Sequence, residues 1–204
     1  LTAKLTCEYT CSVLGSSVNQ DGRTANLTSP SGPAQQRVIA RALLVADRPT
    51  STVAIVDCHG TGTALGDPIE VGALQLVFGR SPGLVLGALK SRLGHTEGAA
   101  GIMGVLKATL SLTSQCVPPN LHLREPNPKI DLDGFAVSMP SGIIPLRSIK
   151  GQDGLHSGVS SFGMSGTNAH VVLAGELQAA SSRLSASAVV YQHTAFAWWD
   201  RGSD

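Results

Sequence analysis

Two histidines in this 204-residue chain occupy glycine- and threonine-rich segments of a kind that can hold a carbonyl compound. His59 opens segment 59–63, HGTGT, and His95 lies in segment 90–98, KSRLGHTEG, which begins with Lys90. Each segment follows a short apolar run, and α/β proteins place their ligand sites at the carboxyl ends of such strands. A neutral imidazole is a good hydrogen-bond donor to a carbonyl or enolate oxygen. The pattern therefore predicts chemistry on a carbonyl group or its enolate.

A third segment, 158–170, reads GVSSFGMSGTNAH. Its density of Gly and Ser predicts a sharp turn with exposed backbone N–H groups, which are the donors that stabilise an oxyanion. Taken singly, each feature also has a plain structural interpretation: His59 as a buried polar residue, His95 as a helix cap, and this segment as a tight hairpin. Taken together, and without paired carboxylates, the three segments favour carbonyl or enolate chemistry.

The cysteines offer neither a metal site nor a nucleophile paired with a base. Cys58 adjoins His59, but neighbouring side chains of a strand point to opposite faces, which disfavours a cysteine hydrolase built on this pair. Cys58, His59 and Cys116 lack the spacing of zinc ligands, so we expect no metal. The glycines after His59 also lack the spacing of a dinucleotide-binding motif.

Composition excludes several classes of protein. The chain is 42% hydrophobic and 14% charged with a net charge of +1, which excludes a disordered chain and leaves no basic field for nucleic acid. No apolar run reaches the roughly 20 residues of a membrane helix, and no signal peptide is visible. Four scattered cysteines favour a reducing compartment, and we expect a cytoplasmic protein. The chain begins with Leu1 rather than Met, so we expect a piece of a longer protein.

Alternating strand and helix patterns predict a layered α/β fold. We expect helices over 33–46, 68–78 and 97–112, the second opened by a capping box of Asp67 and Glu70 and the third capped by Thr96. The expected strands cover 5–14, 52–57, 84–89, 135–139, 155–161 and 169–173.

These segments closely resemble the β-ketoacyl synthase (ketosynthase) domains of type I polyketide synthases. The matching stretches, in the family's order, are GSSVNQDGRTANLTSPSGPAQQ (Gly15–Gln36), DCHGTGTALGDPIEVGAL (Asp57–Leu74), KSRLGHTEGAAGIMGVLK (Lys90–Lys107), PPNLH (Pro118–His122) and GVSSFGMSGTNAHVVL (Gly158–Leu173). The resemblance implies a thiolase-like layered α/β/α fold. It implies that residues 1–14 end the amino half of the domain, that 15–173 form its carboxyl half, and that 174–204 are an Ala/Ser-rich linker and an aromatic tail.

The resemblance also implies a role for each matched residue. His59 and His95 correspond to the catalytic histidine pair, which binds the thioester carbonyl of the extender unit, promotes its decarboxylation and stabilises the enolate. Lys90 corresponds to the active-site lysine, which orders the site electrostatically. Thr61 and Thr63 correspond to residues that hydrogen-bond the phosphopantetheine arm.

The gating loop of the family is matched by Phe162, Gly163 and Met164, and the backbone N–H of Met164 is the expected oxyanion donor. The family's nucleophilic Cys, in a Thr-Ala-Cys-Ser-Ser type of setting, is expected to be absent from this chain. Cys7 and Cys11 lack that setting and precede the NQDG segment by too few residues.

By this resemblance the chain is a fragment of a ketosynthase, whose parent catalyses decarboxylative Claisen condensation of a Cys-bound acyl chain with malonyl-acyl carrier protein. The product is a β-ketoacyl thioester. No cofactor is bound directly, because the substrates are carried on the phosphopantetheine of acyl carrier protein. The expected partners are acyl carrier protein, neighbouring synthase domains, the amino half of the ketosynthase and a second copy of the parent in a homodimer. The alternatives are a truncated, non-catalytic module that binds acyl carrier protein and the ketosynthase of a type I fatty-acid synthase.

Overall fold

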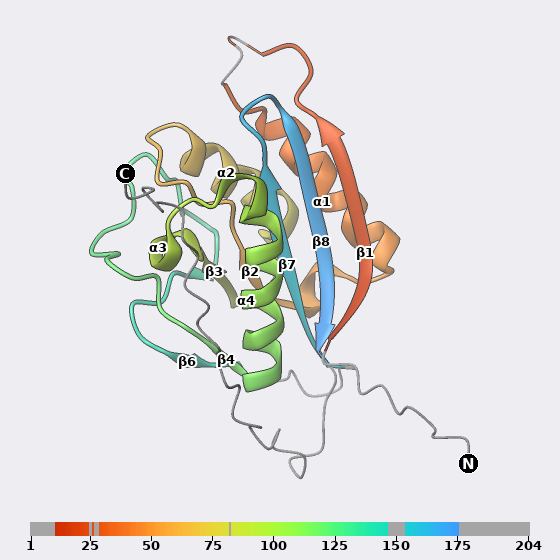
Figure 1. The fold of residues 1–204 in the computed structure, drawn as a ribbon, viewed down its shortest axis with the longest axis vertical. Helices are drawn as coiled ribbons and strands as arrows, with labels where there is room; N and C mark the ends of the chain where they lie inside the picture. The colour runs from red at the N-terminus through yellow and green to blue at the C-terminus, as the bar shows by residue number, and fades with distance from the viewer. Residues whose placement is uncertain (1–10, 25, 27–28, 82, 147–153, 176–204) are drawn as a thin grey trace, which may run out of the picture.

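A single mixed sheet forms the centre of the chain (Figure 1), whose computed structural model describes residues 11–24, 26, 29–81, 83–146 and 154–175. The strands of this sheet are β1 (Cys11–Gln20), β2 (Val53–Asp57), β3 (Leu84–Gly87), β5 (Val137–Ser138), β7 (Leu155–Phe162) and β8 (Thr167–Gly175). Their order is β1-β8-β7-β2-β3-β5. A separate two-stranded sheet joins β4 (Cys116–Val117) to β6 (Ile144–Pro145).

Helices cover both faces of the central sheet. They are α1 (Gly32–Ala46), α2 (Gly66–Phe78), α3 (Lys90–Leu93) and α4 (Ala100–Ser114), with short 3₁₀ turns at Thr50–Thr52 and Glu97–Ala99. Helices α1 and α2 pack against each other on one face, and α4 lies across β7, β8 and β2 on the other (Figure 1). This arrangement confirms the predicted α/β/α layering.

The alternating side chains of the central strands divide the core into two parts, one under each helical layer. In β2, Val56 packs with Leu74 and Phe78 of α2, whereas Ile55 packs with Leu112 of α4. All five of these side chains are at most 3% exposed. Strands buried on both faces read as continuous apolar runs, which is why this strand was visible in the sequence.

Helix α1 forms as its apolar spacing predicts. The side chain of Ser31 caps the helix by accepting from the backbone N–H of Ala34, and Asp47 ends it in the left-handed conformation. The apolar residues that recur at helical spacing in this segment are all buried: Val38, Ile39, Ala42, Leu43 and Ala46.

Strand β1 differs from the expected strand over 5–14. It begins at Cys11 and continues to Gln20, because it pairs with β8 along nearly its whole length. The Asn19 side chain also donates to the carbonyl of Ala34 at 2.7 Å, which ties the strand to α1. Residues 5–10 of that expected strand, and residues 176–204 of the expected linker and tail, lie outside the described residues.

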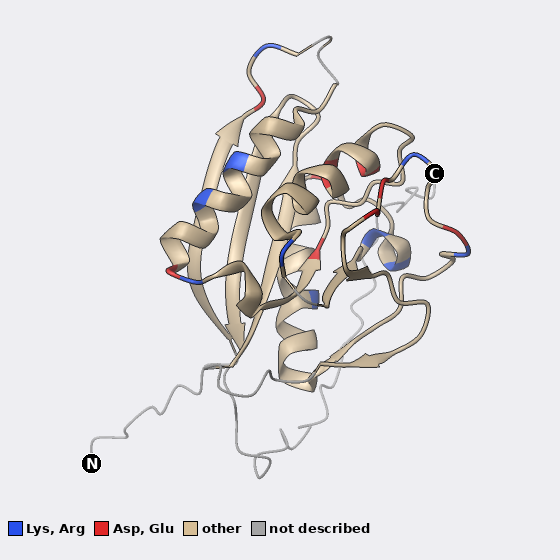
Figure 2. Ribbon diagram, turned by 180° about the vertical axis from the view of Figure 1, so that it is seen from behind, with Lys and Arg blue, Asp and Glu red and all other residues tan. Residues whose placement is uncertain are grey.

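The carboxyl ends of β1, β2, β3 and β7 lie at one edge of the sheet, since the first is antiparallel to β8 and the others are parallel neighbours. Two of the glycine-rich segments follow β2 and β3 at this edge, and the third contains the turn that joins β7 to β8 there. Figure 2 shows that the basic positions are scattered over the helices and loops, and that acidic positions lie beside some of them. No helix within the described ranges is long and apolar enough to cross a membrane.

Candidate active site

One cavity of about 570 Å³, at the carboxyl edge of the sheet, brings together side chains from all three segments. The predicted site residues that line it are His59, Thr61, Thr63, His95, Phe162, Gly163 and Met164. Lys90 lines a neighbouring cavity of about 370 Å³. Its ammonium group nevertheless lies 3.4 Å from Nδ1 of His59, so it adjoins the same centre.

The His59 ring is held by donors directed at one of its two nitrogens. The backbone N–H of Phe162 donates to Nδ1 at 3.3 Å, and Lys90 Nζ approaches the same atom. An Nδ1 that accepts a hydrogen bond cannot carry the proton of a neutral ring, so the proton lies on Nε2. Burial, and then the charges of Lys90 and His95, lower the pKa of His59 to about 4. The ring is therefore a neutral donor at pH 7.

The His95 ring is oriented in the same way by a different element. The backbone N–H of Glu97 donates to its Nδ1 at 3.1 Å, which again leaves the proton on Nε2. The two imidazole centroids are 5.4 Å apart with the ring planes at 84°. The pair thus presents two Nε2–H donors to one cavity.

The expected start of the third helix at Thr96 is wrong. A 3₁₀ turn covers Glu97–Ala99 and α4 begins at Ala100, while Thr96 makes no side-chain cap bond. The His95 ring accepts the first backbone N–H in place of a hydroxyl, which is the helix-cap interpretation considered from the sequence. His95 therefore precedes a 3₁₀ turn and does not sit directly at the N-terminus of the α-helix.

The expected capping box of α2 is also wrong. The helix begins at Gly66, and its N-cap residue, Leu65, makes no side-chain bond. Asp67 and Glu70 lie one turn apart on the helix, and both carboxylates face the preceding loop instead of the helix terminus. Asp67 Oδ1 accepts from the backbone N–H of Gly62 at 3.1 Å. The residue types that signal a cap serve here to fix a loop.

Glu70 holds the backbone on which His59 is carried. Its two oxygens accept from the N–H groups of His59 and Gly60 at 2.7 and 2.9 Å. Burial raises the pKa of this carboxyl to about 7, although both N–H donors act in the opposite direction. Gly60 has φ +46°, and a Cβ there would lie 2.7 Å from that of Ala88. The predicted role of Glu70 in a helix cap is therefore wrong. Glu70 lies eleven residues from His59 in the sequence, and that separation gave no sign of the contact.

The two predicted pantetheine-binding threonines lie beside each other on this loop. Their Oγ1 atoms are 3.4 Å apart, and Thr63 Oγ1 accepts from the backbone N–H of Gly66 at 3.0 Å. Thr61 lines both cavities. The threonine hydroxyls are thus available at the opening of the larger cavity to an amide-bearing ligand.

The third segment forms a tight hairpin between β7 and β8. The backbone N–H of Gly163 donates to the carbonyl of Thr167 at 2.7 Å, and Gly166, with φ +94°, donates back to the carbonyl of Gly163. The side chain of Met164 is 80% exposed at the tip. The structural interpretation and the functional one are both compatible with this geometry, because the hairpin also aims Phe162 N–H at the candidate histidine.

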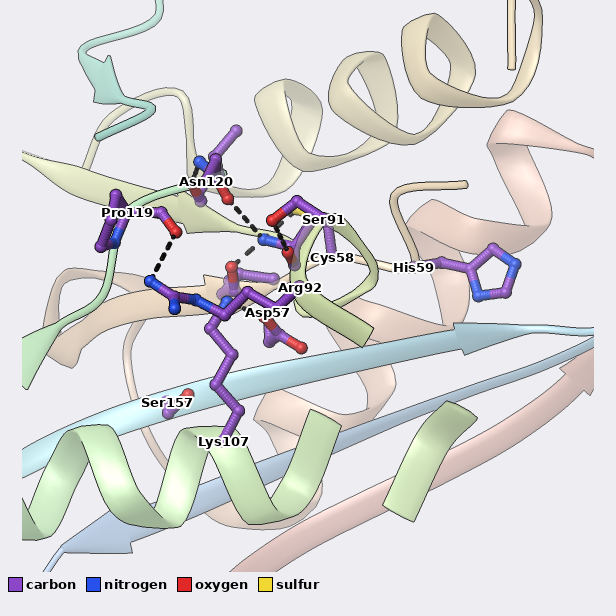
Figure 3. Close-up of polar contacts among 12 residues, drawn as sticks. Asp57, Cys58, His59, Ser91, Arg92, Lys107, Pro119, Asn120 and Ser157 are labelled. Atoms are coloured by element: carbon purple, nitrogen blue, oxygen red, sulfur yellow. Dashed lines mark hydrogen bonds and ion pairs between the residues drawn. The ribbon is translucent and has the colours of Figure 1, made fainter. Parts of the chain in front are cut away.

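Lys90 begins the short helix α3 rather than ending a strand, since β3 stops at Gly87. Burial lowers the pKa of its ammonium group, while nearby carboxylates, Glu70 first, oppose the shift. The Asn120 amide fixes the chain just before this helix by donating to the carbonyl of Leu86 and accepting from the N–H of Ala88 (Figure 3). This role of Asn120 was not predicted.

The cysteines lie apart from the histidine pair. Cys58 lines the smaller cavity, and burial raises the pKa of its thiol. His59 lines the larger cavity, and its side chain points away from Cys58 (Figure 3). Cys11 pairs with Gly175 at the far end of the sheet, and Cys116 contacts Ser114 beyond α4. Within the described part of the chain no cysteine lines the cavity of the two histidines, and no cluster of three potential metal ligands is found.

The sequence matches the profile described as "Beta-ketoacyl synthase, C-terminal domain" over residues 10–124. It is 52% identical over 170 residues to "Erythronolide synthase EryA3" from Saccharopolyspora erythraea, a match over 78% of this chain and 5% of that protein. It is 45% identical over 166 residues to "Mycoketide-CoA synthase" from Mycobacterium tuberculosis, over 79% of this chain and 4% of that protein.

The fold matches the "Ketosynthase from module 6 of the bacillaene synthase from Bacillus subtilis 168", with a TM-score of 0.76 and 34% identity. That match covers 80% of this chain and 30% of the solved one. A layered α/β fold with paired histidines at its carboxyl edge therefore places the molecule among thiolase-like proteins. The chain belongs to the β-ketoacyl synthase family and is similar to the ketosynthases of type I polyketide synthases. The chain spans about a twentieth of the length of the curated relatives named above.

Proposed function

We propose that the chain supplies the carboxyl half of the active site of a polyketide ketosynthase that performs decarboxylative Claisen condensation. The observation that supports this most directly is the orientation of His59 and His95. Their rings stand edge to face, and each Nδ1 accepts a backbone N–H, so both Nε2–H groups are donors to the cavity. Two convergent donors are what a thioester carbonyl needs when it becomes an enolate oxyanion.

The reaction begins with a malonyl thioester whose carbonyl oxygen accepts from the two imidazoles. The bond between Cα and the carboxylate breaks, CO₂ leaves, and the electron pair forms the enolate held by the same donors. Its carbon then attacks the acyl thioester on a Cys outside this chain, and collapse of the tetrahedral intermediate expels the Cys thiolate. Met164 N–H is the proposed donor to that intermediate, because Gly163 N–H is taken by Thr167.

The remaining site residues act through charge and binding. Burial, and after it the Lys90 ammonium beside Nδ1, lower the pKa of His59, and the neutral ring suits a donor to an enolate better than an imidazolium does. Thr61 and Thr63 bind the phosphopantetheine arm, so the group that carries the substrate belongs to acyl carrier protein. The active site would hold no metal or nucleotide of its own.

The great length of the relatives supports the same assembly. We propose as partners acyl carrier protein, neighbouring synthase domains and an amino half that contributes the Cys, in a homodimeric parent. In this proposal residues 15–173 form the carboxyl half, 1–14 end the amino half, and 174–204 follow the domain. The chain alone would then form no carbon–carbon bond from malonyl and acyl thioesters, and detectable condensation by it would contradict the proposal.

The test uses a complete ketosynthase in which residues 11–175 of this chain replace the matching segment of a relative. His59→Ala and His95→Ala are each expected to slow release of CO₂ from a malonyl thioester by about 10²- to 10³-fold, the effect of removing one oxyanion donor. Glu125→Gln, at an exposed loop position that lines neither cavity, is the control and should decarboxylate normally. Unchanged decarboxylation in both alanine variants would remove the assignment.

A further inference from the structure

A buried ion pair lies beneath the candidate histidines, on the α4 side of the sheet. Asp57, the last residue of β2, is 2% exposed, and Lys107, in the middle of α4, is 6% exposed. Lys107 Nζ lies 2.5 Å from Asp57 Oδ1, and Figure 3 shows the lysine reaching from α4 toward the strand. None of the roles proposed above uses either residue.

The Asp57 carboxylate is shared by three elements. It ends β2, it receives the ammonium group of Lys107 from α4, and it accepts a hydrogen bond from the backbone N–H of Leu89, just beyond β3. Burial raises the pKa of this carboxyl, while Lys107 is the largest influence in the opposite direction. The ammonium group thus favours the ionised carboxylate.

Each of these three elements also carries one candidate catalytic residue. Strand β2 leads directly to His59, β3 leads to Lys90, and α4 begins shortly after His95. The carboxylate is therefore the point at which the supports of all three residues are bonded to one another. A change in the length or charge of this side chain would therefore alter the distances between His59, Lys90 and His95.

The surrounding backbone lies close to the ion pair at two glycines. A Cβ at Gly87 would lie 2.7 Å from Lys107 Nζ, and a Cβ at Gly104 would lie 3.1 Å from Asp57 Oδ2 and 2.8 Å from Val159. Both glycines face the pair, one from β3 and one from α4. The slot therefore fits these two side chains and no larger ones.

Stability alone does not account for such a pair. Removing two charges from water is costly, and well-packed apolar residues in place of a buried ion pair are often as stable or more so. An ion pair differs from an apolar contact in fixing direction and distance. The ion pair fixes the relative positions of three elements and lies directly below their functional side chains. Its effect is therefore greatest on the positions of those side chains.

We propose that Asp57 and Lys107 are positioning residues, which set the distances between His59, His95 and Lys90 without touching substrate. This inference rests on the proposed function, since it assigns the pair to the same site. A misplacement of about 1 Å in a catalytic group is enough to lower a rate on the order of 10²-fold. The pair would act on the chemical step and leave substrate binding by the threonines unchanged.

The experiment compares four variants of the complete ketosynthase described above: Asp57→Asn, Lys107→Met, the double variant that carries both changes, and Leu112→Ala. Each single variant leaves a buried charge unpaired, and is expected to melt earlier and to lose kcat for decarboxylation on the order of 10²-fold with KM unchanged. The double variant has no unpaired charge and should regain its melting temperature. Its kcat should stay low, because the directional bond between α4 and the carboxyl end of β2 is then missing.

Leu112→Ala is the matched control, since it opens the core under α4 about one and a half turns beyond Lys107. It should lower the melting temperature while leaving kcat unchanged. If kcat follows the melting temperature through all four variants, or returns in the double variant, the pair is structural and the proposal is wrong.

A second readout does not require turnover. In the same variants labelled with ¹⁵N in histidine, the imidazole signals of His59 and His95 should move in the double variant and stay in place in Leu112→Ala. Signals that stay in place in the double variant overturn the inference. If they move while the unsubstituted enzyme fails to decarboxylate, the positioning role stands and the proposed function is the part that fails.

Discussion

The backbone N–H of Phe162 donates to Nδ1 of His59 across 3.3 Å and so joins the end of β7 to the loop that follows β2. This one bond determines which nitrogen of the ring carries the proton. The Lys90 ammonium approaches the same Nδ1, so two separate elements act on one atom. The ring is thereby both oriented and kept neutral, and its remaining N–H is available to the cavity.

The first prediction concerns this electrostatic effect. Lys90→Met removes a positive charge 3.4 Å from Nδ1, so the pKa of His59 should rise from about 4 toward its ordinary value of 6.5. Burial and His95 remain, so the rise should be partial. An NMR titration of ¹⁵N-histidine measures the shift, with exposed Lys129→Met as the control. An unchanged His59 pKa would show that the two groups do not interact.

The second prediction concerns Glu70, whose two oxygens accept from His59 and Gly60. Glu70→Gln replaces one acceptor by an NH₂ group, so one backbone N–H loses its partner. The free energy of unfolding should fall by about 1–3 kcal/mol, the cost of leaving one backbone N–H without a partner. The decarboxylation rate should fall with it, because the His59 backbone is released. Glu125→Gln, on an exposed loop, should change neither quantity.

Glu70 should also give a pH signature of its own. Its pKa rises from 4.5 to about 7 in the folded chain, so the folded state holds a proton that the unfolded state releases. The stabilisation from this group is complete below pH 4.5 and is lost as the pH rises through 7. Urea denaturation between pH 4.5 and 7.5 should show this slope in the parent sequence and not in Glu70→Gln. Identical slopes would contradict the assignment.

The sequence was a good guide where a pattern is local. Helix α1 and strand β2 appeared in the expected places because their burial follows directly from the spacing of apolar residues. The histidine segments met at one sheet edge because parallel strands share an end. Those inferences needed no knowledge of distant contacts.

Other features depended on contacts between distant parts of the chain. The carboxylates of Asp67 and Glu70 have the spacing of a helix cap. They instead accept hydrogen bonds from backbone N–H groups of the preceding loop. Strand β1 runs past its expected end because β8 offers a partner 150 residues away. The sequence around Asn120 gives no sign of its role, because both hydrogen bonds of its side chain go to the distant end of β3. Rules based on residue propensity consider only neighbours along the chain, so they cannot predict contacts with these distant partners.

The third prediction separates binding from chemistry at the cavity opening. Thr61→Val keeps the side-chain shape but removes the hydroxyl proposed to bind the pantetheine arm. One lost hydrogen bond of about 1 kcal/mol should raise KM for a malonyl-pantetheine substrate about 5-fold with kcat unchanged. Thr63→Ser keeps the acceptor for Gly66 N–H and should be nearly silent. An unchanged KM in Thr61→Val would show that this hydroxyl does not contact substrate.

The last prediction concerns His170, a fully buried histidine on β8. Its Nδ1 lies 2.9 Å from Ser160 Oγ, its Nε2 meets no hydrogen-bond partner among the described residues, and burial lowers its pKa to about 3. The folded chain therefore keeps this ring neutral, while the unfolded chain takes up a proton below pH 6.5. Its contribution to stability is present above pH 6.5 and is lost as the pH falls toward 3.

His170→Asn keeps a hydrogen bond to Ser160 but cannot titrate. At pH 7 the variant should be less stable because a smaller side chain leaves a cavity. Below pH 6.5 the parent sequence should lose stability faster than the variant, by on the order of 1.4 kcal/mol per pH unit, so the two curves converge. Chemical denaturation from pH 7 to pH 4 measures both curves, with exposed His122→Asn as the control. Parallel curves would show that His170 takes up its proton equally in the folded and unfolded chain, and that burial on β8 does not keep it neutral.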